Sequence, residues 1–464
     1  MAGIGFQLER LFDRKGVLKL CQAYIYAGVI SVGPMLLYVI MLLGVALVSN
    51  IAGMCKLDGK VMNCMMTYSL LISLFVTSGF NMVITRYTSD RLYEKRYDEI
   101  MPSLYGSCGI MLVLEVILYG CFLYLARVPF DQGVVCLWLA LVMTVVWIEM
   151  IYLMILKDYK LILIGFLTSL MVGFLLALIL ALLQMITIAR LMGCVTISFG
   201  VMMVWYHSLL LRHFPASKGS AFRFLRWIKR YPSLVFIGFF LCLGLYGHLC
   251  IMYFGPLHHQ TMGLFYIAPM YDIPALFAFF SILITIITFF TSVEVRFYPK
   301  YMRYYGLFNE RGSIRDIESA EDDMVNVLGH EILILAVKQL IVSILAIVGG
   351  GFIMDLLPLG MTELGKDIFR ILCVGYGLYA VANSVMLIML YFEDYRGAFI
   401  GTGLFSIISV VVTTIQMLKG DIVFYGLGFS IGAMIFLAFS TVRLFWTTNN
   451  LQYLLLRRYG YEES

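Results

Sequence analysis

Two acidic residues, Glu115 and Glu149, stand inside long apolar stretches of this 464-residue chain. A carboxylate in bilayer hydrocarbon costs several kcal/mol unless it faces a partner or a water-filled cavity, so such residues are the usual functional candidates of membrane proteins. Glu115 lies near mid-depth, where its short side chain is unable to reach the headgroups. Two interpretations stand for both residues: a carboxylate that lines a cavity or couples transport to an ion, or a protonated or helix-bonded structural glutamate.

Lys338, Asn81 and Asn383 also lie inside apolar stretches. Lys338, like Arg370, is within about one turn of a predicted interface, so its long side chain can carry the charge to the headgroups; a place in the cavity is the alternative. The asparagines, together with His248, either form hydrogen bonds between helices or line a pathway. Lys338, Asn81 and Asn383 therefore join the two glutamates as cavity or coupling candidates.

The elements that position these residues are apolar helices. The composition is 62% hydrophobic and 13% charged, far from the roughly 25% charged residues of a soluble domain. Bilayer hydrocarbon about 30 Å thick requires about 20 apolar helical residues per crossing, because a helix satisfies its own backbone polar groups. The sequence therefore predicts an all-α polytopic membrane protein. Its twelve predicted spans are 24–48, 67–84, 106–125, 134–156, 161–183, 191–211, 232–254, 274–293, 333–354, 368–390, 397–418 and 424–445.

Lys and Arg residues are distributed unevenly between alternate loops. If the N-terminus is inside, 25 of the 33 Lys and Arg residues fall on the inner side and 6 in outer loops. Because cytoplasmic loops retain positive charge, this bias predicts that both termini are cytoplasmic, with Lys56, His258 and Lys366 outside. The first span is too long for a cleavable signal and is expected to remain as an anchor. The net charge of +5 is spread over short loops, which favours contact with membrane lipids and not with nucleic acid.

A basic segment divides the twelve spans into two groups of six. The first group, 24–211, is predicted to form an N-terminal lobe, and the second, 232–445, a C-terminal lobe. The segment between them, 212–231, interleaves Arg and Lys with aromatic residues and is predicted to be a cytoplasmic linker on anionic lipid. An interfacial helix at 1–23 and a cytoplasmic tail at 446–464 complete the predicted organisation.

The longest loop, 294–332, is the only one predicted to hold ordered structure outside the membrane. Ser313 followed by Asp316 is typical of a helix start. The helix that follows carries an acidic face, so it is either a solvated helix or a docking site for a basic partner protein.

Signatures of enzymes are absent from the sequence. It has no phosphate-binding glycine loop, no metalloprotease or serine-hydrolase motif, and no Cys/His spacing typical of zinc. No loop is long enough for a nucleotide-sugar domain. The sequence thus predicts a transporter without catalytic residues, metal or cofactor, and leaves open whether H⁺ or Na⁺ drives it. Cys55 and Cys64, both in the first outer loop, are either paired or separate thiols.

A set of short motifs resembles one family, the PelG exporters of Pel polysaccharide, from residue 1 to about 450. The motifs are GIGF at 3–6, SVGP at 31–34, RYTSDRLY at 86–93, FYP at 297–299, YY at 304–305, GSIRDIE at 312–318 and EDYRG at 393–397. The resemblance implies a flippase-type fold: twelve helices in two six-helix lobes around a central cavity, working by alternating access or channel-like passage. It also implies export of an N-acetylgalactosamine-rich polysaccharide across the bacterial inner membrane.

The same resemblance implies partners: a separate cytoplasmic glycosyltransferase and membrane proteins that sense cyclic di-GMP. Three alternatives stand beside polysaccharide export. The chain is a flippase for lipid-linked oligosaccharide, an ion-coupled drug exporter of the same fold, or a non-transporting scaffold for a polysaccharide synthase.

The second and eighth spans end alike, with Arg86 and Arg296 each followed by an aromatic residue. In the flippases that this chain resembles, these two helices line the cavity, and a pseudo-two-fold axis along the membrane normal would bring their ends together. Arg86 would then meet Glu294, and Asp90 would meet Arg296, as a cytoplasmic gate that closes in one state and opens in the other. The alternative is a local i,i+4 pair between Arg86 and Asp90, with Arg296 on lipid phosphate.

Overall fold

The computed structural model describes most of the chain, including the greater part of every predicted span. The described residues are 33, 36–45, 47–49, 51, 53–153, 159–215, 219–309, 312–356 and 361–455. The predicted interfacial helix at 1–23 lies outside them, as does the predicted tail beyond residue 455.

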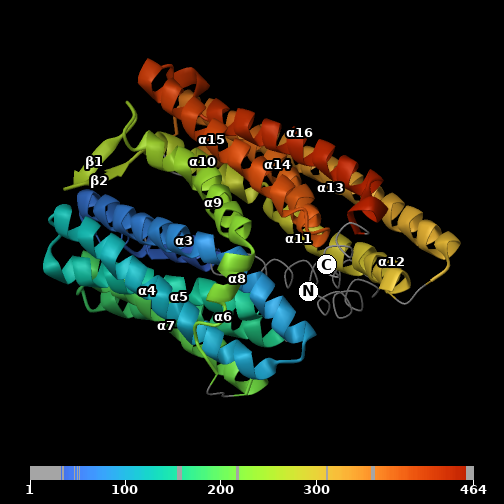
Figure 1. Ribbon diagram of the computed structural model, residues 1–464. Coiled ribbons are helices and arrows are strands. Elements are labelled where there is room, and N and C mark those ends of the chain that lie inside the picture. The colour runs from blue at the N-terminus through green and yellow to red at the C-terminus, as the bar shows by residue number, and fades with distance from the viewer. Residues whose placement is uncertain are drawn as a thin grey trace, which may run out of the picture. The chain divides into compact units, whose positions relative to one another are not determined.

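Within the described residues, eleven helices are long and apolar enough to cross a membrane, and a shorter apolar helix, Leu36–Ser49, precedes them. The long helical elements are α3 (Lys56–Tyr93), α4 (Ile100–Leu125), α5 (Phe130–Leu153), α6 (Tyr159–Leu182), α7 (Ile188–His213), α9 (Pro232–Met252), α10 with α11 (Pro269–Phe280 and Leu283–Thr291), α13 (Ile314–Leu356), α14 (Glu363–Tyr391), α15 (Tyr395–Lys419) and α16 (Leu427–Asn449) (Figure 1). Each overlaps one predicted span, which confirms the prediction of a polytopic all-α membrane protein.

Short elements connect the long helices. They are η1 (Tyr97–Glu99), α8 (Leu225–Arg230), β1 (His259–Met262), β2 (Phe265–Ile267), η2 (Ser292–Phe297), α12 (Tyr298–Asn309) and η3 (Ile422–Phe424). The two strands, which the sequence did not predict, pair as an antiparallel hairpin.

The chain divides into two compact units. The N-terminal unit comprises the described residues up to Cys242 together with Leu257–Ala268, and the C-terminal unit comprises Leu243–Pro256 and the described residues from Pro269 onward. The boundary falls inside α9, so the first half of this helix belongs with the N-terminal unit. The reason is close packing: a Cβ atom added at Gly238 would lie 2.1 Å from the carbonyl oxygen of Ser78 in α3.

In the N-terminal unit, α5 contacts α3, α4 and α7, and α6 packs on α7. The β hairpin caps one end of this unit. The Tyr68 hydroxyl of α3 donates to the Tyr266 carbonyl oxygen at 3.1 Å and accepts from the Tyr266 N–H at 3.2 Å. At the hairpin turn, Gly263 has φ +55°, and a Cβ there would lie 2.1 Å from the Ala126 carbonyl oxygen. Glycine is therefore required for the turn to approach the end of α4.

In the C-terminal unit, α14 contacts α10, α11, α13, α15 and α16. The eighth span is not one regular helix: α10 and α11 are separated at Ser281 and Ile282, and the chain then forms a π-helix, η2, before α12. α12 packs on the first half of α13 around the buried Tyr304 and Met324. A π-helix inside an α-helix is rare and recurs at functional positions.

The predicted loop helix and the predicted ninth span form one continuous helix, the 43-residue α13. Its predicted start is confirmed, because the Ser313 hydroxyl accepts from the Asp316 N–H at 3.2 Å. The acidic residues Asp316, Glu318 and Asp322 are exposed, as expected for a solvated face.

Candidate functional site

Glu115 is fully buried inside the N-terminal unit. Its side chain has 0% exposure, and neither carboxyl oxygen makes a hydrogen bond. The Thr144 side chain of α5 lies beside it. Val113 and Ile117, neighbours on α4, are 59% and 60% exposed. Glu115 thus points into the unit and away from the exposed apolar side of its helix.

Glu149 is also buried, at 1% exposure, but it has a partner. Its Oε1 atom is 3.1 Å from Nδ1 of His207 on α7, and Nε2 of His207 is 3.2 Å from the Tyr105 hydroxyl on α4. Neither His207 nor Tyr105 is among the candidates that the sequence predicts. A histidine inside the apolar stretch 191–211 was the available signal for this pair.

The other predicted cavity residues are distributed over both units. Asn81 is exposed on α3, Asn383 is half-buried on α14, and Lys338 is exposed on α13. Lys338 stands among exposed apolar side chains such as Val337 and Ile341, the environment in which a lysine extends along its helix to reach polar surroundings. A role for these three residues in a cavity remains a prediction.

Two further polar residues of the C-terminal unit have local partners. Arg370 pairs with Asp367 at 2.7 Å, one turn away on α14. His248 is fully buried, with Nδ1 at 2.8 Å from the Tyr271 hydroxyl, while its Nε2 atom makes no hydrogen bond. His248 therefore links α9 to α10, as expected for an interhelical hydrogen bond.

Arg86 and Asp90, predicted as gate residues, pair locally at the end of α3. The Arg86 Nε atom is 3.1 Å from Asp90 Oδ1, in i,i+4 spacing. The other Asp90 oxygen accepts a 2.7 Å hydrogen bond from the Trp227 indole, and the Arg86 guanidinium lies 5.5 Å from the Tyr231 ring centre. Both residues therefore contact the linker between the two groups of six spans.

A buried ionic cluster extends this contact. Arg91 on α3, with a side chain 6% exposed, pairs with Glu99 at 3.3 Å, and its guanidinium lies 4.7 Å from the Trp227 ring centre. Arg223 of the linker pairs with the same Glu99 carboxylate. One side of the linker thus docks on protein. Among the described residues of the linker, Arg226, Lys229 and Arg230 are exposed; their contact with lipid remains a prediction.

In the C-terminal unit, Glu294 and Arg296 lie within the π-helix η2. Arg296 pairs with Glu331 of α13 at 2.7 Å; the arginine side chain is 61% exposed and the glutamate 6%. The second Glu331 oxygen makes no hydrogen bond. As at α3, the arginine that ends the span has a partner within its own unit, and the predicted cross-lobe gate remains a prediction.

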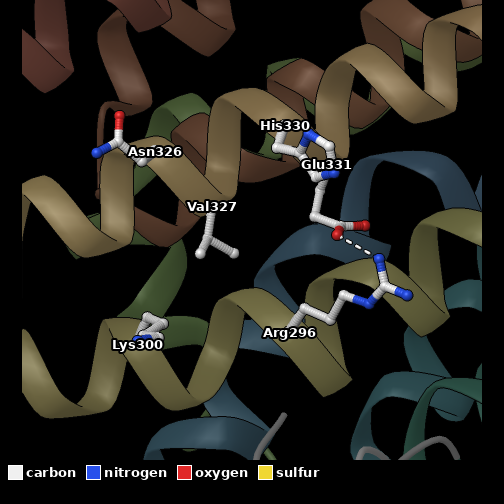
Figure 2. Close-up of a pocket in the computed structure, with 6 residues that line it drawn as sticks. All are labelled: Arg296, Lys300, Asn326, Val327, His330 and Glu331. Atoms are coloured by element: carbon white, nitrogen blue, oxygen red, sulfur yellow. Dashed lines mark hydrogen bonds and ion pairs between the residues drawn. The ribbon is translucent and has the colours of Figure 1, made fainter.

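An open cavity of about 480 Å³ lies between α12 and α13 (Figure 2). The Arg296–Glu331 pair borders it at one end, and Lys300, paired with Asp323 at 3.1 Å, stands on the α12 side. The remaining lining residues are Asn326, Val327 and His330. The side chains around the cavity include both hydrogen-bond donors and acceptors, although most of its surface is apolar.

Among the described residues, no cluster of three His, Cys, Asp or Glu side chains could hold a metal ion. Cys55 and Cys64 are separate thiols: Cys55 is exposed, whereas the buried Cys64 donates to the Tyr266 carbonyl oxygen at 3.7 Å.

Comparison with known families gives one match over nearly the whole chain. The PelG family model, described as "Putative exopolysaccharide Exporter (EPS-E)", matches residues 1–455. No curated protein matches the chain.

Solved structures of transporters share the fold. The chain is similar to a MATE protein in the straight conformation, with a TM-score of 0.65, 11% identity, and coverage of 97% of this chain and 100% of that one. For a MOP superfamily transporter from Pyrococcus furiosus, the TM-score is 0.61 and the identity 12%, with coverage of 97% of this chain and 99% of that one. For the Vibrio cholerae MATE transporter VcmN, the TM-score is 0.62 and the identity 12%, with coverage of 92% of this chain and 98% of that one. These likenesses confirm the predicted twelve-helix, two-lobe transporter fold.

Proposed function

The chain belongs to the PelG family of exopolysaccharide exporters, and from this premise we propose that it carries a Pel-like, N-acetylgalactosamine-rich polysaccharide across the bacterial inner membrane. The observation that carries the proposal is the family match over residues 1–455, which includes the helices outside the predicted spans as well as those within them. A transporter fold alone is shared by proteins with many cargoes.

The charge distribution supports a cargo with little net charge. Only 13% of the residues are charged, and the two intramembrane glutamates, Glu115 and Glu149, are buried within the N-terminal unit. The cavity between α12 and α13 has a mainly apolar surface with a few polar side chains at its border. A sugar hydroxyl both donates and accepts hydrogen bonds, so it suits a site that combines Arg296 and Lys300 with Glu331.

The proposal extends to orientation and partners. The bias of 25 to 6 Lys and Arg residues supports cytoplasmic termini, which would put α12 and the start of α13 on the cytoplasmic side. The exposed acidic residues Asp316, Glu318 and Asp322 are then available to a basic partner. The family relationship supports a cytoplasmic glycosyltransferase and a cyclic di-GMP-sensing membrane protein as the partners, with no catalysis by this chain.

A deletion strain tests the proposal. Without the chain, polymer should accumulate inside the cell while secreted polymer disappears, and the wild-type gene should restore secretion. Loss of both intracellular and secreted polymer would support the scaffold alternative. Unchanged secretion would refute an exporter of this polymer. Purified protein in vesicles that moves the glycan unaided would exclude a scaffold.

A further inference from the structure

Three side chains of the N-terminal unit form a line from its surface into its interior. Tyr105 is 50% exposed, the His207 side chain is 33% exposed, and Glu149 is 1% exposed. The Tyr105 hydroxyl is 3.2 Å from His207 Nε2, and His207 Nδ1 is 3.1 Å from Glu149 Oε1. The imidazole therefore stands between an accessible hydroxyl and an inaccessible carboxyl group.

The surroundings isolate this carboxyl group. Among the described residues, the Cys108 thiol of α4 and the Tyr206 hydroxyl of α7 also lie near it, and both are neutral near neutral pH. His207 is the basic group that acts on Glu149 among the described residues. Among the described residues, the second oxygen of Glu149 is buried and makes no hydrogen bond, so the 3.1 Å contact with His207 is the hydrogen bond through which a proton can reach this carboxyl group.

We propose that Tyr105, His207 and Glu149 form a proton-binding site, loaded through the imidazole from the exposed side. This goes beyond polysaccharide export, because the ligand is the proton and the site binds it whatever the cargo.

The three groups conserve protons through each step. In the unloaded state, Nδ1–H of neutral His207 donates to the Glu149 carboxylate, and Nε2 accepts from the Tyr105 hydroxyl. A proton that arrives at Nε2 makes an imidazolium, which donates from both nitrogens. Transfer of the Nδ1 proton to Glu149 then leaves a neutral carboxyl group that donates to Nδ1, while Nε2–H donates to the Tyr105 oxygen. One proton has been gained, and the direction of every hydrogen bond has reversed.

Loading removes a negative charge from the interior of the unit. In the unloaded state, the buried charge on Glu149 is stabilised only while His207 remains within hydrogen-bond distance. The neutral carboxyl group of the loaded state does not need this partner to the same degree. Proton binding therefore loosens the requirement that α5 and α7 stay in register at this point. By linkage, any movement of these helices that separates the pair favours the loaded state.

Glu115 provides the internal comparison. It is equally buried on the neighbouring α4, but among the described residues it has no histidine partner and neither of its oxygens makes a hydrogen bond. A proton on Glu115 lacks an equivalent route from the surface through an ionisable side chain.

Infrared difference spectroscopy on the full-length protein in lipid nanodiscs tests the site directly. Acidification from about pH 8 to pH 5, the range in which histidine sites titrate, should produce a protonated-carboxyl band. That band should be missing in Glu149→Gln, and its midpoint should move by about tenfold or more in proton concentration in His207→Gln. Tyr119→Phe, which removes a buried tyrosine hydroxyl elsewhere on α4, should keep the wild-type band and midpoint.

The proposal is overturned if the band persists in Glu149→Gln, or if the midpoint in His207→Gln equals that of the wild type. Should Glu149→Gln fail to insert, Glu149→Asp retains a carboxyl group that is shorter by one methylene. Its band should then titrate with a shifted midpoint, and an unshifted midpoint would also overturn the proposal. The samples contain no polysaccharide, so these results are independent of whether the chain exports one.

Discussion

The indole nitrogen of Trp227 donates a 2.7 Å hydrogen bond to the carboxylate of Asp90. Trp227 belongs to α8, in the linker between the first six spans and the second six, and Asp90 belongs to the end of α3. The ring also lies 4.7 Å from the Arg91 guanidinium. The linker is therefore bound to the end of α3, the helix end that the sequence predicts to be part of a gate.

Replacing Trp227 should loosen this attachment. Trp227→Leu loses a hydrogen bond to a charged acceptor, worth about 1.5–3 kcal/mol, together with the contact to Arg91. We expect a lower unfolding temperature and faster labelling of a cysteine introduced at exposed Lys229. Arg226→Ala, an exposed change on the same short helix, should stay within about 0.5 kcal/mol of wild type. Equal stability of the two variants would contradict the role of Trp227.

The local pair and the predicted cross-lobe gate make different predictions for Arg86. Arg86→Glu should reduce export, because it puts two carboxylates where Arg86 and Asp90 now pair at 3.1 Å. Adding Asp90→Lys rebuilds the local pair, whereas adding Glu294→Arg rebuilds the predicted gate. Secreted polymer per inserted protein is the measurement. Partial rescue by Glu294→Arg supports the gate, and strictly additive defects in that double variant refute it.

Gly106 on α4 should tolerate no larger residue. A Cβ there would lie 2.0 Å from the carbonyl oxygen of Ala221, whereas a Cβ at Gly109 would meet nothing within 4 Å. Gly106→Ala should therefore cost about 1–3 kcal/mol through overpacking. Gly109→Ala, one turn along the same helix, should be neutral or stabilising because alanine favours helix. The unfolding temperature in detergent measures the stability of both variants. Similar unfolding temperatures would contradict the prediction and show that the backbone at Ala221 can move aside without cost.

Glu115→Gln should lower export while leaving the amount of protein in the membrane nearly unchanged. The substitution keeps the shape of a side chain that makes no hydrogen bond and removes only its capacity to ionise. Polymer secretion and membrane abundance are measured in the same cells. Normal secretion would mean that Glu115 is a structural residue.

The predicted orientation can be tested with single cysteines in a cysteine-depleted chain. His258 and Ser313 are both exposed, but the charge bias predicts that they lie on opposite sides of the membrane. An impermeant reagent should label His258→Cys in intact cells and should label Ser313→Cys only after permeabilisation. The reverse pattern would refute the topology.

The spans could be predicted from the sequence because apolar length alone determines where a helix can cross a membrane. The continuity of α13 could not be predicted. The change from polar to apolar residues near Leu333 shows where the helix would pass from water into the bilayer, but it gives no information on whether the backbone hydrogen bonds continue there. The π-helix η2 gives no signal in hydropathy, and strands of three or four residues are too short for a periodic pattern.

The candidate residues were predictable as types but not as partners. Glu149 stands out as a carboxylate in an apolar stretch, yet its partner His207 is 58 positions away in sequence. Only the packing of α5 against α7 brings them together. Arg91 and Glu99 were not predicted for the same reason. In the sequence, each looks like an ordinary charged residue between two spans, and only the fold brings Arg223 to Glu99 and Trp227 to Arg91.

α13 is one helix of 43 residues, about 64 Å long at 1.5 Å per residue, whereas bilayer hydrocarbon is about 30 Å thick. Such a helix behaves as a stiff rod, since a sharp bend would break its backbone hydrogen bonds. A sideways push on the acidic end near Asp316 therefore tilts the apolar end as well, with the membrane as the fulcrum. A partner protein that binds the acidic end would therefore be able to change the tilt of α13 and so act on the C-terminal unit.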